Sequence, residues 1–287
     1  YKLIFQFKIF NKMKIYIQSN KYQKLASMVS KYSFERFGHE VEIMNVEENN
    51  FLSDKLNHEI LRKGKKTIYR NDLQSFTLLR FLAPQLNNYR DKILVVDPDI
   101  FALKDPKKII EDHSNTSDLS CVFYNNIPRS EMMLVDAKRV KWNFKNIVSN
   151  LFNFEIDYED LMNFKFNSDL TINKLSECYN SYDKINDDTI LLHTTNRITQ
   201  PWKEGLEINF FKNNLPKFQI FKEHVKKIIG KSYNEEFISK SFLKHPNKDV
   251  KNCIKNLFKE AKRLNYFSQE DIEKEVANLN ISRKIFE

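Results

Sequence analysis

Residues 92–101, KILVVDPDIF, place two carboxylates directly after four consecutive aliphatic residues. The aliphatic run at 93–96 predicts a strand buried on both faces, and Asp97 and Asp99 follow its carboxyl end. In open α/β sheets, ligands bind outside the carboxyl ends of the strands. Two carboxylates there are costly unless hydrogen bonds or a cation compensate their charge. Either a divalent cation binds both, or Asp97 caps a turn while Asp99 faces solvent.

A second group of polar residues follows another predicted strand, at residues 189–192. This strand runs directly into His193, and Arg197 and Lys203 lie a few residues later. If the two strands lie near each other, His193 can join the two carboxylates around one ion, and the two cations can face phosphate oxygens. A single histidine at a strand end more often makes a structural hydrogen bond, and that alternative stays open.

The composition limits which partners the chain can bind and which kinds of phosphate-binding site it can contain. The chain has 287 residues and 41% hydrophobic content, enough to bury a full core, and its net charge of +9 favours an anionic partner. It contains only 4 glycines, no two of them close together, which excludes a P-loop and a GxGxxG fingerprint. Cations must therefore bind any phosphate. Because no nucleic-acid-binding signature is present, we expect no nucleic-acid partner.

The first two thirds of the chain alternate between short apolar strands and amphipathic helices. This alternation predicts an α/β sheet with helices on its faces. Strands are expected at residues 14–18, 41–46, 93–96, 119–123, 132–135 and 189–192. Helices are expected at 22–37, closed by Gly38; at 73–86, ended or bent by Pro84; after Asp105 as cap with Pro106 in the first turn; and from Asp136 as cap through Phe144.

From about residue 216 the pattern changes to lysine-rich helices without strands. We expect a catalytic domain at residues 1–215 and a basic helical C-terminal extension at 216–287. Ser268 and Asp271 have the spacing of a capping box. A helix before it has one apolar face and one lysine face, the latter either solvated or facing an anionic surface. The apolar face comprises Val250, Ile254, Leu257, Phe258, Ala261 and Leu264, and the lysine face Lys251, Lys255, Lys259 and Lys262.

The location of the protein is inferred from its cysteines and its apolar runs. Cys121, Cys178 and Cys253 are odd in number, far apart and form no CxxC, which favours reduced core thiols. No apolar run reaches the roughly 20 residues of a membrane span, and the first ten residues have no cleavage site of a signal peptide. We expect a cytoplasmic protein with peripheral membrane contact through its basic C-terminal helices. Whether residues 1–12 precede a native start at Met13 stays open, and nothing in the sequence indicates the oligomeric state.

Five segments, in this order along the chain, resemble motifs of GT-A-fold glycosyltransferases. The resemblance is strongest to family 8, the retaining galactosyl- and glucosyltransferases, and it covers roughly residues 13–205. It implies a Rossmann-like mixed sheet flanked by helices. The segments are Arg80-Phe81, KILVVDPDIFALKDP from Lys92, SEMMLVD at 130–136, DYEDLMN at 157–163 and HTTNRITQPWK at 193–203.

The resemblance implies an activity and a metal. Asp97, Asp99 and His193 would bind Mn²⁺ or Mg²⁺, which bridges the diphosphate of a UDP-sugar. The implied reaction transfers a hexose, with retention, to a glycan or lipid-linked acceptor. One alternative is a nucleotidyltransferase that makes sugar nucleotides, although the Gly-rich loop usual in those enzymes is absent. The other is a non-catalytic binder of anionic polymers or membranes through the C-terminal helices.

The resemblance also implies which residues contact the donor. Gln18, Ser19 and Asn20, at the end of the first strand, would lie by the uracil and ribose. Arg80 and Asp160 would approach the donor sugar or its phosphate and are the expected catalytic residues.

The chain departs from the family motifs at three places. Gln200 stands where the family has a phosphate-binding lysine, so Arg197 or Lys203 must take that role. Asn196 replaces a glycine, and residues 129–131, Arg-Ser-Glu, replace an Asn-Ser-Gly. These departures leave two alternatives: a distant member of the family with a rearranged acceptor side, or a member of a related family whose donor differs.

Overall fold

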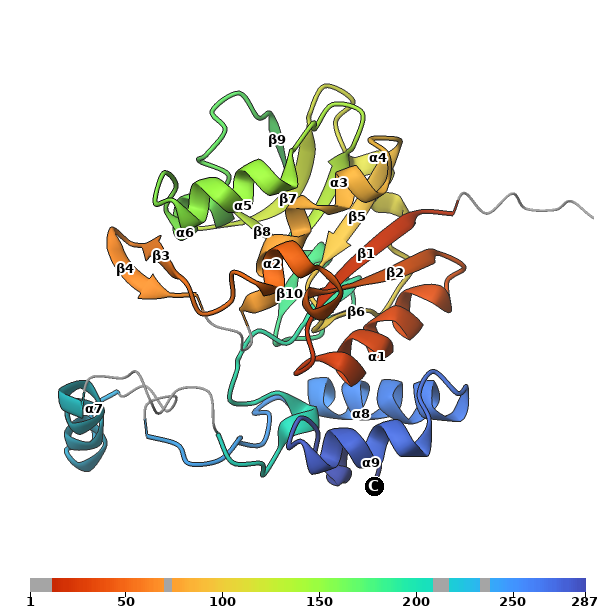
Figure 1. Cartoon of the computed structure of the whole chain (residues 1–287). Coiled ribbons are helices and arrows are strands. Elements are labelled where there is room, and N and C mark those ends of the chain that lie inside the picture. Colours follow the sequence, from red (N-terminus) through yellow and green to blue (C-terminus); the bar gives the residue numbers. More distant parts are fainter. Residues whose placement is uncertain (1–11, 70–73, 209–216, 233–237) are drawn as a thin grey trace, which may run out of the picture.

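The predicted buried strand, β5 (Lys92–Val96), lies inside a six-stranded mixed sheet of order β2-β1-β5-β8-β7-β9 (Figure 1). This computed structural model describes residues 12–69, 74–208, 217–232 and 238–287. β1 is parallel to β2 and β5, whereas β8 is antiparallel to β5 and β7. The other strands are β1 (Lys14–Ser19), β2 (Glu40–Asn45), β7 (Leu119–Tyr124), β8 (Ile127–Asp136) and β9 (Ile172–Leu175).

The continuous aliphatic run of β5 is explained by burial on both faces of the sheet. Ile93 and Val95 belong to one hydrophobic cluster, and Leu94 and Val96 belong to another. Successive side chains of a strand point to opposite faces, so all four positions are core positions. The predicted mixed α/β sheet with helices on its faces is confirmed.

A smaller three-stranded sheet begins where β5 ends. It comprises β6 (Ile100–Ala102), β10 (Ser181–Tyr182) and β11 (Leu191–His193) in the order β10-β11-β6. β11 pairs antiparallel with β6, so that His193 lies opposite Ile100. The strand expected at 189–192 thus lies beside the continuation of β5, in the second sheet rather than in the first.

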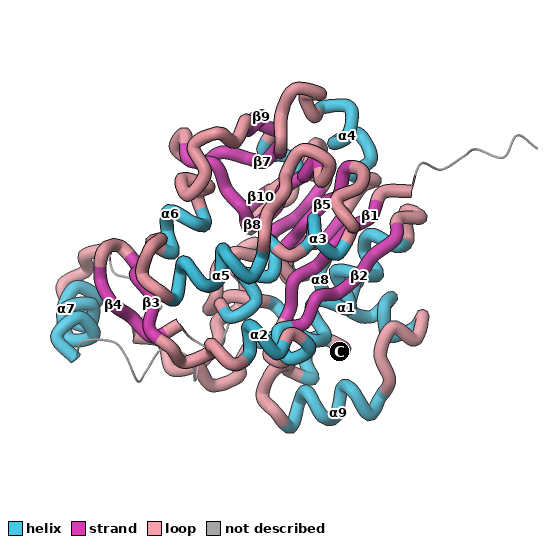
Figure 2. The backbone as a smooth tube through the Cα atoms, turned by 45° about the horizontal axis from the view of Figure 1, so that its top comes forward, coloured by secondary structure: helices cyan, strands magenta, loops and turns pink. Residues whose placement is uncertain are grey.

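Helices cover both faces of the large sheet (Figure 2). α1 (Lys24–Glu35) contributes Phe34 to the cluster that contains Leu94, whereas α5 (Phe144–Phe152) packs in the cluster that contains Ile93. The remaining short elements are α2 (Asn50–Ser53), α3 (Ala83–Leu86), α4 (Ile109–Asp112), α6 (Tyr158–Met162), the hairpin of β3 (Glu59–Arg62) and β4 (Lys65–Ile68), and 3₁₀ turns at Val46–Glu48, Ser75–Phe81, Pro106–Lys108, Glu177–Tyr179, Pro201–Lys203 and Arg283–Ile285.

The helix predicted at 73–86 was only partly right. Ser75–Phe81 forms 3₁₀ turns and α3 is a separate short helix, whereas Leu73 lies outside the described residues. Pro84 does not end a helix, because it lies in the first turn of α3, where its missing N–H costs nothing.

The helix predicted to start at Asp136 is also placed wrongly. Asp136 ends β8, and its carboxylate accepts a hydrogen bond from the backbone N of Lys138 in a turn. α5 begins at Phe144, capped by Asn143, whose side chain accepts from the backbone N of Asn146. The predicted cap at Asp105 is confirmed, because its side chain accepts from the backbone N of Lys107.

The last two helices of the chain form a further layer on α1 (Figure 1). The apolar face of α8 (Lys248–Arg263) shares one hydrophobic cluster with Leu25 and Val29 of α1, with Trp202 and with residues of α9 (Gln269–Ala277). Leu264, predicted on that face, is 50% exposed, because α8 ends at Arg263.

Three further findings bear on the predictions from composition. The predicted domain boundary at 215/216 lies outside the described residues. The three cysteines are free thiols; Cys121 is buried and the other two are half-buried. In the described part of the chain, no helix has the length and apolarity that crossing a membrane requires.

The capping box of α9 is confirmed, and it gives the first testable prediction. Asp271 accepts from the backbone N of Ser268 and pairs with Lys24 of α1 at 2.8 Å. These contacts, Lys24 first, lower the pKa of Asp271 from 3.8 to about 2. The ionised form therefore stabilises the folded state above pH 3.8, and this stabilisation is lost as the pH falls towards 2.

We expect Asp271→Asn to lower the free energy of unfolding by about 1 kcal/mol near pH 6, and by less near pH 3. Urea denaturation at both pH values measures the difference. Asp249→Asn, in the first turn of α8 where Asn247 does the capping, is the matched control. An equal loss at both pH values would contradict the assignment.

Candidate metal centre

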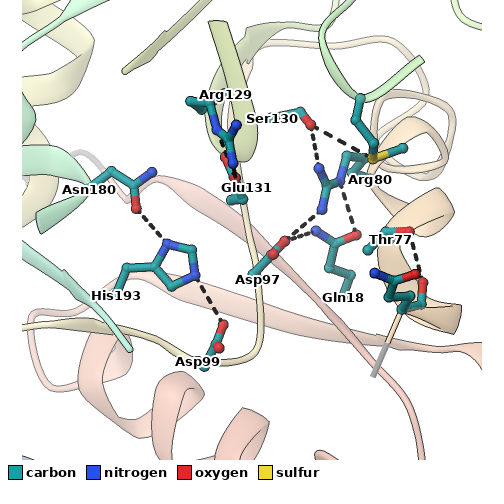
Figure 3. Close-up of polar contacts among 12 residues, drawn as sticks. Gln18, Thr77, Arg80, Asp97, Asp99, Arg129, Ser130, Glu131, Asn180 and His193 are labelled. Atoms are coloured by element: carbon teal, nitrogen blue, oxygen red, sulfur yellow. Dashed lines mark hydrogen bonds and ion pairs between the residues drawn. The ribbon is translucent and has the colours of Figure 1, made fainter. Parts of the chain in front are cut away.

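Three of the predicted side chains meet where the two sheets join. Asp97 and Asp99 lie in the turn between β5 and β6, and His193 ends β11 (Figure 3). One potential ligand atom from each of the three lies within 4.8 Å of the others. The Nε2 atom of His193 is 3.3 Å from the Oδ1 atom of Asp99. These three atoms are close enough together to hold one small cation.

The turn that carries the two carboxylates is fixed at both ends. The backbone N of Asp97 donates to the carbonyl of Glu131, and the backbone N of Ile100 donates to the carbonyl of Asp97 at 3.3 Å. Pro98 thus occupies the second position of a four-residue turn, where its fixed φ is favoured. The carbonyl of Asp99 accepts from the backbone N of Thr194 at 3.1 Å, which fastens the turn to the end of β11.

Asn180 holds the imidazole of His193 in one orientation. The Nδ1 atom of His193 lies 2.8 Å from the Oδ1 atom of Asn180. Because that oxygen can only accept, Nδ1 carries the hydrogen and Nε2 faces Asp99. Burial lowers the pKa of His193, but the carboxylates of Asp99, Asp97 and Glu131 together raise it, so that the net direction is upwards.

Arg80 provides the charge that compensates Asp97. Its Nη2 atom donates to the Oδ1 atom of Asp97 at 2.9 Å, and it also donates to the hydroxyl of Ser130. Gln18 donates to the same oxygen of Asp97, and no described residue donates to Oδ2. Burial raises the pKa of Asp97 to about 7, although the Arg80 guanidinium lowers it. Asp97 is therefore a carboxylate that still lacks full compensation.

The cluster opens into a cavity of 670 Å³, the size of a site for a small organic ligand. Both signs of charge line it, together with aromatic rings. The cationic side chains are Arg62, Arg80, Arg129, Lys184 and Arg197; the acidic ones outside the cluster are Glu131, Glu159 and Glu177; and the aromatic ones are Phe76, Phe123, Tyr124, Tyr158 and Tyr182.

The predicted nucleotide residues of β1 lie behind the cavity wall. Gln18, Ser19 and Asn20 are buried, and none of the three lines the cavity. Their side chains bond to Asp97, to Ser27 at 3.0 Å and to Ser75 at 2.8 Å, respectively. Gln23, which precedes α1, lines the cavity at this end instead.

Some of the residues predicted to contact phosphate or sugar line the cavity, and others do not. Arg197 lines the cavity, whereas Lys203 is buried with its Nζ atom 5.4 Å from the centre of the Phe242 ring. Asp160 lies outside the lining and pairs with Lys165 at 3.3 Å. Its neighbour Glu159 lines the cavity and accepts from the Nε atom of Arg62 at 2.8 Å.

Sequence reasoning missed several residues of the cavity. Arg129 and Glu131 form an ion pair on β8, where Arg129 holds the pKa of Glu131 below its usual range despite burial. Charged residues at the start of an otherwise apolar strand were a signal that could have identified them. Asn180 carries no comparable signal, because its role depends on a contact across 13 residues of chain.

The comparisons with known proteins are limited to structures. No protein-family model and no curated sequence matches the chain. The galactosyltransferase LgtC, in complex with donor and acceptor sugar analogues, aligns with a TM-score of 0.46 and 13% identity, over 66% of this chain and 89% of that chain. The glycosyltransferase GlyE of Streptococcus pneumoniae TIGR4 aligns with a TM-score of 0.46 and 15% identity, over 78% of this chain and 65% of that chain. Mouse xyloside xylosyltransferase 1 aligns with a TM-score of 0.41 and 11% identity, over 64% of this chain and 97% of that chain. Scores below 0.5 at such identity do not establish a relationship.

The Arg80–Asp97 pair gives the second prediction. We expect Arg80→Met to lower the free energy of unfolding by roughly 3 kcal/mol, because it leaves a buried carboxylate without its partner. Adding Asp97→Asn should recover much of that loss. Chemical denaturation of the two single variants and the double variant measures the coupling.

Arg139→Met is the matched control, because its pair with Asp118 is more exposed and should contribute under about 1 kcal/mol. If the losses of Arg80→Met and Asp97→Asn simply add, the pair does not stabilise the fold as described.

Proposed function

We propose that the protein is a metal-dependent glycosyltransferase that moves a hexose from a nucleoside diphosphate sugar, UDP-sugar by the motif resemblance, to a glycan or lipid-linked acceptor. The observation that carries the proposal is the cluster of Asp97, Asp99 and His193 at the mouth of a mixed-charge cavity. The proposal also includes the GT-A assignment and the cytoplasmic location.

The donor set fits a divalent cation that accepts both oxygen and nitrogen. Two carboxylates alone suit Mg²⁺ as well as Mn²⁺, but an imidazole favours the softer Mn²⁺. A bound cation would neutralise phosphate oxygens and stabilise the charge that a diphosphate gains as it leaves. Asp97 and Asp99 would hold the cation through carboxylate oxygens, and His193 through Nε2, the nitrogen left free by Asn180.

The residues around the cluster bind and orient the donor. Arg80 donates to Asp97 and to Ser130. It therefore holds Asp97, a proposed metal ligand, in place and also puts a positive charge in the cavity wall. Arg197 lines the cavity just past His193 and is the residue that we propose for the diphosphate, in place of Lys203. The Nε2 atom of Gln200 donates to Oδ2 of Asp99 at 3.3 Å, which orients that carboxylate.

The cavity lining favours one acidic side chain for contact with the sugar. The resemblance implied Asp160, but its neighbour Glu159 lines the cavity while Asp160 does not. We therefore assign sugar positioning to Glu159, held by Arg62, and keep retention as the expected stereochemistry. No covalent nucleophile is assigned.

The third prediction tests the metal assignment. UDP together with Mn²⁺ should raise the melting temperature of the wild-type protein, and Asp99→Asn should weaken Mn²⁺ binding at least about 100-fold, because it removes a ligand charge. Asp169→Asn, which changes an exposed turn residue, is the matched control. The melting temperature without ligand shows whether each variant is folded. No stabilisation by any nucleoside diphosphate with Mn²⁺ or Mg²⁺ would refute the proposal.

The fourth prediction concerns Asn180. Asn180→Ala removes the acceptor that fixes His193, and we expect Mn²⁺ affinity to fall about tenfold. Asn180→Asp keeps an acceptor at the same place and should bind Mn²⁺ nearly as well as the wild type. Titration calorimetry with Mn²⁺ measures both. Equal affinities for wild type and Asn180→Ala would show that the bond does not orient the ligand.

A further inference from the structure

The helix α7 (Lys217–Ile228) turns apolar side chains outward. Phe221 is 66% exposed and Ile228 is 82% exposed. With Val225 they follow the spacing of four and three residues that places side chains on one helix face. Among residues 221–228, whose side chains are described, the buried one is acidic: Glu223 is 6% exposed. Over these residues, α7 exposes apolar side chains and buries an acidic one, the reverse of a helix that packs on a core.

Lysines surround this apolar face. Residues 217–231 contain five lysines and a single acidic residue, Glu223. Lys222, Lys227 and Lys231 are exposed, and Lys226 pairs with Glu223 at 2.6 Å. On the helix, Lys222 and Lys226 lie to one side of the apolar face and Lys227 to the other.

We propose that α7 binds the surface of an anionic lipid bilayer, with Phe221 and Ile228 inserted between the headgroups and the lysines in contact with their negative charges. A short helix with an apolar face between lysines is suited to lie in the plane of a membrane surface. Long lysine side chains can reach the headgroups while their stems cover apolar surface.

Charge decides between a bilayer and a second copy of this chain. Two α7 faces brought together would place two lysine rims against each other, which is unfavourable, whereas an anionic surface attracts both rims. In both views of the backbone α7 lies apart from α8 and α9, so this contact would not disturb their packing (Figures 1 and 2).

The lysine face of α8 is a poorer candidate for the same contact. Its apolar face is already buried against α1, so α8 offers charge without an apolar surface to insert. Two of its lysines are also engaged, since Lys251 pairs with Glu204 at 2.5 Å and Lys259 bonds to the carbonyl of Glu287 at 2.7 Å. The membrane contact expected of the C-terminal helices is thereby assigned to α7. The assignment does not depend on the proposed transferase activity.

The experiment is co-sedimentation of the full chain with vesicles of phosphatidylcholine, with and without about 30% phosphatidylserine. We expect binding to the anionic vesicles that weakens near 0.5 M NaCl, because salt screens the lysines. Phe221→Ser with Ile228→Ser should weaken it about tenfold or more, by removing the inserted side chains. Lys222→Glu with Lys231→Glu should abolish the preference for phosphatidylserine.

Leu264→Ser with Leu279→Ser is the matched control, because both leucines are 50% exposed and lie outside α7. Its binding should stay within about twofold of the wild type. Three results would overturn the proposal: no binding of the wild-type chain to anionic vesicles, an equal loss in the control, or a dimer that Phe221→Ser with Ile228→Ser converts to a monomer without any vesicle binding.

Discussion

The site depends on how the fold compensates the negative charge at the end of a buried strand. Asp97 is 7% exposed and follows four strand residues that lie in the core. Arg80, brought there by the 3₁₀ turns at Ser75–Phe81, supplies a positive charge at 2.9 Å. One guanidinium does not fully compensate two carboxylates, and burial still raises the pKa of Asp97 to about 7. The remaining deficit is what makes the site suited to a cation: the fold tolerates the charge, and a bound ion would complete it.

The same constraint explains why polar side chains from several segments bond to the members of the cluster. Gln18 donates to Asp97, Gln200 to Asp99, and Asn180 accepts from His193. Each bond holds a ligand candidate from outside the cluster. Such outer contacts set the orientation of ligands and cost affinity when they are removed. Gln18, expected at the nucleotide, bonds to Asp97 in this structure, and its contact with a nucleotide stays a prediction.

How far the sequence could predict this site depends on how local each feature is. The buried strand, the two carboxylates at its end and the capping box of α9 follow from residues close together in the chain, and the structure has all three. His193 was a conditional prediction, because it required β11 to lie near β5. The partners of the cluster could not be predicted, since Arg80, Ser130, Asn180 and Gln200 come from four separate segments joined only by tertiary contacts. Local signals also misplaced one helix start: the backbone N of Asp136 stays in the sheet ladder, and its carboxylate bonds to a turn at Lys138 that does not continue as a helix.

Pro98 now has a physical explanation. A strand that continued past Val96 in the large sheet would keep both carboxylates on one face of that sheet, two residues apart along its ladder. The turn at residues 97–100 instead moves the chain into the second sheet, and proline suits its second position because φ is fixed there and no N–H is required. β6 then pairs with β11, and the carbonyl of Asp99 accepts from Thr194, the residue directly after His193. One proline turn thus both places the two carboxylates side by side and determines which strand end delivers the histidine.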